Sequence, residues 1–239
     1  MRRITLVRHG ETFQNRDLTV QGADPTWGRL TQEGVRQAQL LGKALAGRNF
    51  EVAYCSPLER AVMTLSLVLC AREGERTTPL VFHDDLKEIN LSNLQGRSRQ
   101  AWHEAITGDP MRFCPPEGES WLDVQKRVTR YFEETILRGP QQEILIVAHG
   151  GVNRGIIASL LGISMAETWA GHGFGAPQDN TCVNILELNG SGEVTGADIN
   201  DTSHLAGEFP TASAGQRWLF GERRWELLGI SREEGSPGA

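Results

Sequence analysis

The sequence predicts a layered α/β protein in which buried strands alternate with helices. Short apolar runs typical of strands alternate along the chain with segments whose apolar residues recur at helical spacing. The chain has 239 residues, 39% of them hydrophobic and 23% charged, so it has enough material for one well-packed core. We expect one domain over residues 1–230 and a disordered tail at 231–239.

Strands and helices are expected in turn along the first part of the chain. A strand at 4–7 precedes a long polar loop at 10–29. A helix then runs to about residue 46, and Thr31 is a suitable N-cap because its hydroxyl can accept a backbone N–H. After it come a strand at 52–55, a helix with Ser56 as N-cap and Pro57 at its first position, and a strand at 80–82.

The middle of the chain is weakly regular before the alternation resumes. A helix is expected near 98–107, and residues 89–119 are interpreted as a lid-like insertion, since long irregular segments often form such walls. Ser120 and Asp123 approximate a capping box. The helix they begin runs to about 137, followed by a strand at 143–148, a helix at 152–161 and a hairpin of 182–188 with 193–199 around Asn189-Gly190.

Charge and cysteine usage narrow the class of protein. The net charge of −6 argues against a nucleic-acid binder but allows a small anionic substrate held by local arginines. The four cysteines show no metal-ligand or disulfide pattern, which favours free thiols in a reducing cytoplasm. A strand begins almost at the N-terminus and no apolar run is long enough for a membrane span, so we expect neither a signal peptide nor a membrane partner.

Two expected strands end in a histidine followed by glycine. His9 follows the first strand, beside Arg8 and Gly10, and His149 follows the strand at 143–148, before Gly150. Arg60 lies in the first turn of the helix after another strand, where a cation is unfavourable unless an anion lies beside it. Because parallel strands bring such ends to one edge of the sheet, an anion site is indicated there. A metal site is disfavoured, since two arginines would repel the cation.

These motifs resemble those of a known family. Arg8-His9-Gly10-Glu11-Thr12, Arg60 after a strand, a later acidic residue and Ala148-His149-Gly150-Gly151 are similar to the histidine phosphatase superfamily, which includes the cofactor-dependent phosphoglycerate mutases. The resemblance runs from about residue 3 to 200. It implies a three-layer α/β/α sandwich with a mostly parallel central sheet, as in phosphoglycerate mutase-like proteins.

The resemblance also implies roles for individual residues. His9 would be the nucleophile that forms a phosphohistidine, and Glu88 the general acid, with Asp84 and Asp85 as local rivals. The glycine and tryptophan that usually follow this acid are missing in the region of Ser92 to Gln95. Arg8, Arg60 and His149 would neutralise the phosphoryl oxygens, and substrate contacts are implied for Asn15, Gln21, Gly22 and Gly150.

The predicted activity is that of a phosphatase hydrolysing a small-molecule phosphomonoester, a histidine acid-phosphatase-like enzyme that needs no metal and no cofactor. A mutase is the alternative, for which 89–119 offers Arg97, Arg99 and Arg112 but no adjacent arginine pair. A non-catalytic protein that binds a phosphate ligand, and a homodimer, also stay open. Aromatic residues and one further histidine are candidates for the mouth of the site: Trp27, Trp102, Phe113, Trp169 and His172.

Overall fold

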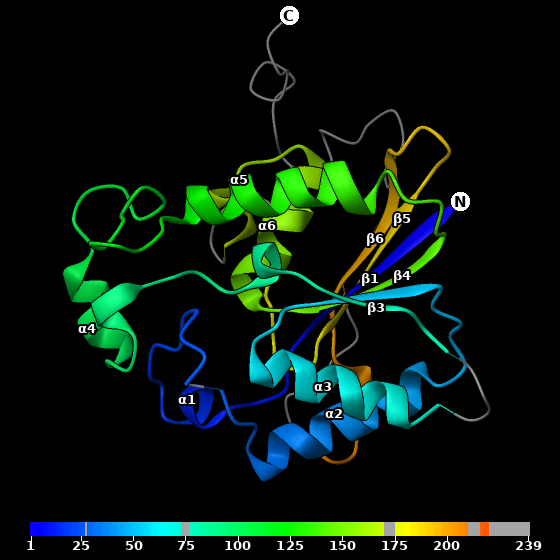
Figure 1. Cartoon of the computed structure of the whole chain (residues 1–239), viewed down its shortest axis with the longest axis horizontal. Coiled ribbons are helices and arrows are strands. Elements are labelled where there is room, and N and C mark those ends of the chain that lie inside the picture. The colour runs from blue at the N-terminus through cyan, green and yellow to red at the C-terminus, as the bar shows by residue number, and fades with distance from the viewer. Residues whose placement is uncertain (27, 73–76, 170–174, 210–215, 220–239) are drawn as a thin grey trace, which may run out of the picture.

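A seven-stranded sheet runs through the described part of the computed structural model, which comprises residues 1–26, 28–72, 77–169, 175–209 and 216–219. The strands lie in the order β3-β2-β4-β1-β5-β6-β7 (Figure 1). Their bounds are β1 (Arg2–Arg8), β2 (Val52–Cys55), β3 (Leu80–Phe82), β4 (Glu143–Ala148), β5 (Val183–Leu188), β6 (Val194–Asp201) and β7 (Gln216–Leu219).

The sheet has a parallel half and an antiparallel half. Strands β3, β2, β4 and β1 pair in parallel, as helical crossovers allow. Strand β5 pairs antiparallel with β1, and β6 and β7 continue in that manner. The predicted hairpin around Asn189-Gly190 is therefore confirmed. Strand β7 was not predicted, because the sequence after residue 202 lacks a clear apolar period.

Helices cover both faces of the sheet and complete the predicted three-layer α/β/α sandwich (Figure 1). Helices α2 (Gln32–Leu45) and α3 (Glu59–Cys70) lie on one face. Helices α5 (Trp121–Tyr131) and α6 (Gly150–Leu161) lie on the other. The fold class is as expected from the alternation of strand and helix patterns.

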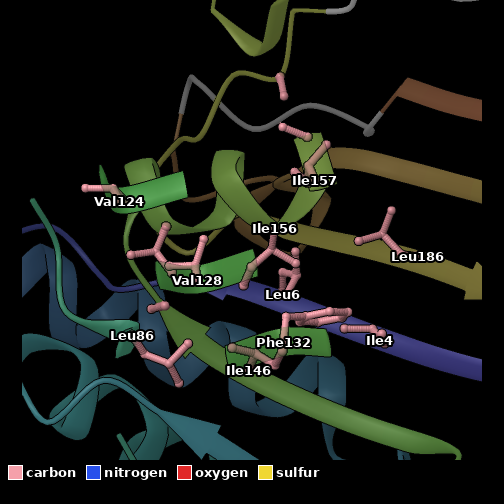
Figure 2. Packing of buried hydrophobic residues seen from close by; sticks show 14 of the residues in the cluster. Ile4, Leu6, Leu86, Val124, Val128, Phe132, Ile146, Ile156, Ile157 and Leu186 are labelled. Carbon is pink, nitrogen blue, oxygen red and sulfur yellow. The ribbon is translucent and has the colours of Figure 1, made fainter. Parts of the chain in front are cut away.

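The alternation of side chains along each strand divides the core in two. Ile4 and Leu6 of β1 belong to the cluster under α5 and α6, where they pack with Val128, Phe132 and Ile156 (Figure 2). Their neighbour Val7 belongs to the cluster on the α2 and α3 side. Both faces of the strand are thus buried, as expected for the centre of a doubly covered sheet.

Two short helices lie over the carboxyl ends of the parallel strands. Helix α1 (Phe13–Arg16) interrupts the loop predicted at 10–29 and has Thr12 as its N-cap. Helix α4 (Arg99–Ala105) lies within the irregular stretch as expected, capped by Ser98. The two occupy the same end of the molecule in Figure 1. They form part of the wall of the cavity described below.

Caps and helix ends agree with the sequence in most places. Thr31 caps α2, and Ser120 with Asp123 forms the predicted capping box. Ser56 as the N-cap of the next helix is wrong: α3 begins at Glu59 after Leu58, whose side chain cannot cap. Helix α5 ends at Tyr131 and passes into a π-helical turn at Phe132–Ile136.

The tail expected at 231–239 lies outside the described residues, as do Trp27 and His172. Of the helices that are described, none combines the length and the apolar character needed to cross a membrane.

Candidate active site

The register of the parallel strands brings the ends of β1, β2 and β4 together. Arg8 of β1 pairs with Ala148 of β4, so the next residues, His9 and His149, become neighbours. The backbone N–H of His9 donates to the carbonyl of Ala148 at 3.1 Å, and the two imidazole centroids are 5.2 Å apart. Ser56 reaches the same edge, because its N–H donates to Val147 of β4 at 3.0 Å.

His9 is held as a neutral imidazole with a defined tautomer. Its Nδ1 lies 2.8 Å from the carbonyl oxygen of Gly10, and because a carbonyl only accepts, Nδ1 carries the proton. Its Nε2 therefore keeps a lone pair. Burial, followed by the charges of Arg60 and Arg8, holds the pKa of His9 well below its usual value. The ring is 3% exposed, so water competes little for that nitrogen.

Arg60 is a buried cation at the same edge. Its Nε donates to Nδ1 of His149 at 3.2 Å, and its Nη2 donates to the carbonyl of Gly22 at 2.8 Å. Since Nδ1 of His149 accepts, the proton lies on Nε2, which donates to Oγ of Ser56 at 2.7 Å. His149 is thus used on both nitrogens within the protein. Its contacts orient Arg60, and its own ring does not line the cavity.

Arg8 supplies the second guanidinium. Its Nη1 donates to the carbonyl of Gln178 at 2.5 Å, while its Nε is buried without a hydrogen-bond partner. Burial lowers the pKa of Arg8, and burial also lowers the pKa of Arg60 to about 10. A guanidinium keeps its proton in proteins at pH 7, so both side chains stay charged. Two desolvated cations beside one imidazole make a strong site for an anion.

The loop after β1 contributes polar groups. Asn15 accepts through Oδ1 from Nδ2 of Asn180 at 3.0 Å, which leaves its own Nδ2 available to a ligand. Gln21 lies next along the loop, where its Oε1 accepts from the hydroxyl of Thr12 at 3.4 Å. Gly22 has a φ of +58°, and a Cβ there would meet Oε1 of Gln95 at 2.1 Å. Only glycine therefore fits this turn, which presents its carbonyl to Arg60.

Two backbone N–H groups hold the carboxyl group of Glu88 in place. Its Oε1 accepts from the N–H of Ile89 at 3.0 Å, and its Oε2 accepts from the N–H of Gly151 at 3.1 Å. A Cβ on Gly151 would lie 2.2 Å from the Trp121 ring and 2.5 Å from Glu88, so the contact depends on glycine. Each carboxyl oxygen keeps a second lone pair for a proton.

A partly buried ion pair supports the backbone around Glu88. Arg127 and Glu119 are joined by bonds of 2.7 and 3.1 Å. The same guanidinium donates to the carbonyls of Asp85 at 2.7 Å and Glu88 at 3.2 Å, and Glu119 accepts from the N–H of Asn90 at 2.9 Å. The chain is thus tied down on both sides of Glu88.

A cavity of about 490 Å³ opens over these groups. Eight of the predicted site residues line it, together with Trp102 and Trp169 from the predicted mouth, and Phe113 does not. The rivals Asp84 and Asp85 line a separate cavity of about 610 Å³, which Glu88 also borders. The site residues on the wall of the first cavity are Arg8, His9, Asn15, Gln21, Gly22, Arg60, Glu88 and Gly150.

Some residues at the site were not predicted from the sequence. Ser56 was expected only as a cap, and its bond to His149 depends on the register of β2 against β4. Asn180 donates to the carbonyl of His9 at 3.1 Å, but nothing in its sequence context indicates this. Arg154 lines the cavity, and its place four residues after Gly150 was a usable signal, because that spacing is one helical turn.

In the part of the chain that the structure describes, no group of three histidine, cysteine, aspartate or glutamate side chains is arranged to hold a metal ion.

The sandwich fold and the two guanidiniums around a strand-end histidine define an α/β protein with a pocket for a small anion such as a phosphate ester. A sequence model of the histidine phosphatase superfamily (branch 1) matches residues 4–201. The chain belongs to this superfamily, as its motifs predicted.

Relatives within the superfamily include phosphatases and mutases. The adenosylcobalamin/alpha-ribazole phosphatase of Escherichia coli (strain K12) is 33% identical over 174 residues, covering 70% of this chain and 83% of that protein. The 2,3-bisphosphoglycerate-dependent phosphoglycerate mutase of Bartonella quintana (strain Toulouse) is 34% identical over 180 residues, covering 70% of this chain and 84% of that protein. The solved structure of the alpha-ribazole phosphatase from Shigella flexneri matches with a TM-score of 0.70 at 30% identity, covering 80% of this chain and 93% of that one.

Proposed function

We propose that this protein is a phosphatase that hydrolyses a small-molecule phosphomonoester through a phosphohistidine on His9, without a metal ion. The observation that carries the proposal is the tautomer of His9. Its Nδ1 proton is committed to Gly10, and its pKa is depressed by burial and by Arg60 and Arg8, so Nε2 is free to attack. Membership in a superfamily with phosphatase relatives supports it.

In the first step, Nε2 of His9 attacks phosphorus and the bond from phosphorus to the ester oxygen breaks. The leaving oxygen takes a proton from the Glu88 carboxyl group. Arg8 and Arg60 neutralise charge on the equatorial oxygens, and most of the catalysis of phosphoryl transfer comes from such positioning and charge. The nucleophile starts neutral, so it must be unprotonated at the pH of the reaction.

In the second step, water replaces the alcohol. The Glu88 carboxylate accepts a proton from this water, whose oxygen attacks phosphorus while the bond to Nε2 of His9 breaks. Inorganic phosphate leaves, and both side chains return to their starting protonation. The bonds from Ile89 and Gly151 would hold the carboxyl in place through this exchange of roles.

We assign the walls of the site to the segment 89–119 in a single domain spanning 1–230. Ile89, Leu91, Arg99 and Trp102 from this segment border the cavity, which supports a lid-like role. Within the phosphatase class, we propose a histidine acid-phosphatase-like phosphomonoesterase.

A phosphoenzyme-trapping experiment tests the nucleophile. The protein is mixed with a labelled phosphomonoester, quenched in base to preserve phosphohistidine, and then treated with acid. We expect an acid-labile label in the wild type and in His103→Ala, which removes another histidine from the same cavity wall. His9→Ala should show neither label nor turnover. Full turnover by His9→Ala would refute the mechanism, and binding of vanadate without turnover by the wild type would identify a non-catalytic protein.

Mutase activity is the second candidate because a mutase is among the relatives. Of the three arginines in 89–119, Arg99 lines the cavity, whereas Arg112 pairs with Asp109 and Arg97 donates to the carbonyl of Asn93. Incubation with a phosphoglycerate separates the activities. A phosphatase releases phosphate, and a mutase yields the isomer.

A further inference from the structure

Arg154 stands beside the phosphate-binding groups but is not one of the residues that the mechanism uses. It lies on α6, one turn after Gly150, and lines the cavity. A Cβ built on Gly150 would meet Nη1 of Arg154 at 3.4 Å and Nε of Arg8 at 3.8 Å. The glycine therefore leaves room for two guanidiniums to approach the same point.

The positive charge of Arg154 is not compensated locally. Within the described ranges, its guanidinium makes no ion pair and no hydrogen bond, and its Nε is buried without a partner. Burial, followed by the charge of Arg8, lowers the pKa of Arg154 to about 10, and Glu88, Cys182 and Asp179 oppose this without reversing it. A desolvated cation next to a second cation is unfavourable until an anion joins it.

Tryptophan rings form the wall around this cation. The Arg154 guanidinium lies over the ring of Trp169, 4.3 Å from its centroid. Trp121 packs edge to face against Trp169 with 5.2 Å between the ring centroids, and Trp102 packs against Trp121 with 6.3 Å between the centroids. All three rings border the cavity. They offer flat apolar surface, and they keep Arg154 in a setting where charge–charge contacts are stronger than in water.

We propose that Arg154 is a specificity residue: it binds a second acidic group, carried by the leaving group of the substrate, whose flat or apolar body lies against Trp102, Trp121 and Trp169. This inference rests on the proposed phosphatase function and deepens it. The substrate class is thus a phosphomonoester of an alcohol or phenol that also bears a carboxylate or a second phosphate.

The alternative is that Arg154 binds the phosphoryl group itself. Arg8, Arg60 and Asn15, which line the cavity from β1, α3 and α1, would already surround that group. Arg154 comes from one helical turn further along α6, on the tryptophan side. The two roles differ in a measurable way, because the transferred phosphoryl group is common to every substrate while the second acid is not.

A set of aryl phosphates with one common ring tests the proposal. It compares 4-carboxyphenyl phosphate with the uncharged 4-carbamoylphenyl phosphate, together with both 3-substituted isomers. A second comparison uses 4-(phosphonomethyl)phenyl phosphate, in which a phosphonate replaces the carboxylate. It distinguishes a phosphate-type second acid from a carboxylate. We expect kcat/KM to be about 10- to 100-fold higher for an acidic ester than for its amide, the range of a charge-assisted hydrogen bond.

Variants then assign the preference to one side chain. Arg154→Met should abolish the preference for the acid while leaving hydrolysis of the amide within about threefold, and Arg154→Lys should retain part of the preference. Arg97→Met, an exposed arginine outside the cavity, is the matched control and should keep the full preference. If Arg154→Met does not fold, the preference for the acid over the amide is compared between the wild type and Arg154→Lys, and a smaller preference in Arg154→Lys supports the proposal.

Three results would overturn the proposal: equal rates for acid and amide in the wild type, a preference that survives in Arg154→Met, or a uniform loss on every ester in that variant. The last would assign Arg154 to the phosphoryl group. If no ester is hydrolysed, the phosphatase function fails instead. Calorimetric binding of the acid and amide esters still measures the Arg154 subsite in that case.

Discussion

Arg60 and His149 share a hydrogen bond in which the guanidinium donates and the imidazole accepts, with 3.2 Å between Nε and Nδ1. Both side chains are at most 1% exposed. Burial, with Arg60 and His9 nearby, holds the pKa of His149 well below its usual value. The bond exists only while His149 is neutral, so the orientation of Arg60 depends on an uncharged neighbour.

Replacing His149 should therefore damage the site through Arg60. In His149→Ala, Nε of Arg60 loses its acceptor in a dry setting, and we expect kcat/KM to fall about 10- to 100-fold. Ser56→Ala removes only the bond to the far nitrogen of His149 and should cost less, about threefold to tenfold. Steady-state kinetics on one phosphomonoester measures both. A larger loss in Ser56→Ala than in His149→Ala would contradict this order.

The imidazole of His9 should stay neutral well into the acidic pH range. Because its folded pKa is depressed, the imidazole stays unprotonated as the pH falls through 6.5. Removing a positive neighbour in Arg60→Gln favours the protonated form and should raise this pKa. NMR titration of isotope-labelled histidine, with the exposed His103 as internal reference, follows the change. A wild-type titration midpoint for His9 at or above 6.5 would disprove the lowered pKa of this side chain.

Stability should fall on acidification before the carboxylates titrate. His9 and His149 have depressed folded pKa values, and burial lowers the pKa of His204 to about 4. Below pH 6.5 the unfolded chain binds protons that the folded chain refuses. Each such histidine then reduces the free energy of unfolding by about 1.4 kcal/mol per pH unit. Denaturant titrations between pH 7 and about 5 should show this slope, and His204→Gln should make it shallower.

Two adjacent glycines should differ in their tolerance of alanine. A Cβ at Gly151 would lie 2.5 Å from Glu88 and 2.2 Å from Trp121, so Gly151→Ala must displace the carboxyl group. Gly150→Ala meets its nearest atom at 3.4 Å. We expect kcat for an alkyl phosphate to fall by about tenfold or more in Gly151→Ala and clearly less in Gly150→Ala. Equal effects in both variants would argue against this role for Gly151.

The ion pair of Arg127 and Glu119 should matter most when the leaving group is poor. Arg127→Met releases the backbone around Glu88, so proton donation suffers while phosphate binding is retained. An alkyl phosphate needs that proton, whereas p-nitrophenyl phosphate does not. We expect kcat to drop about tenfold for the former and little for the latter. Arg130→Met, on the same helix and more exposed, is the control. Equal losses on both esters would indicate a general structural effect.

The fold could be predicted from the sequence because its signals are local. Buried strands such as β4 and capped helices such as α2 are set by apolar period and by caps like Thr31. The meeting of His9 and His149 could be anticipated from parallel strand ends. Ser56 could not, because the register of β2 decides its contact. The tryptophan wall depends on packing between α4, α5 and the segment after α6 that carries Trp169, which no local pattern encodes.

The central position of β1 has a consequence for how this protein can change. His9, the proposed nucleophile, follows directly on a strand that is hydrogen-bonded on both sides, whereas the tryptophans and Arg99 stand on connecting segments and helices. Selection for a different substrate can therefore rework those outer parts without disturbing the reactive centre. A family built in this way can diversify its chemistry of recognition while its bond-breaking apparatus stays fixed.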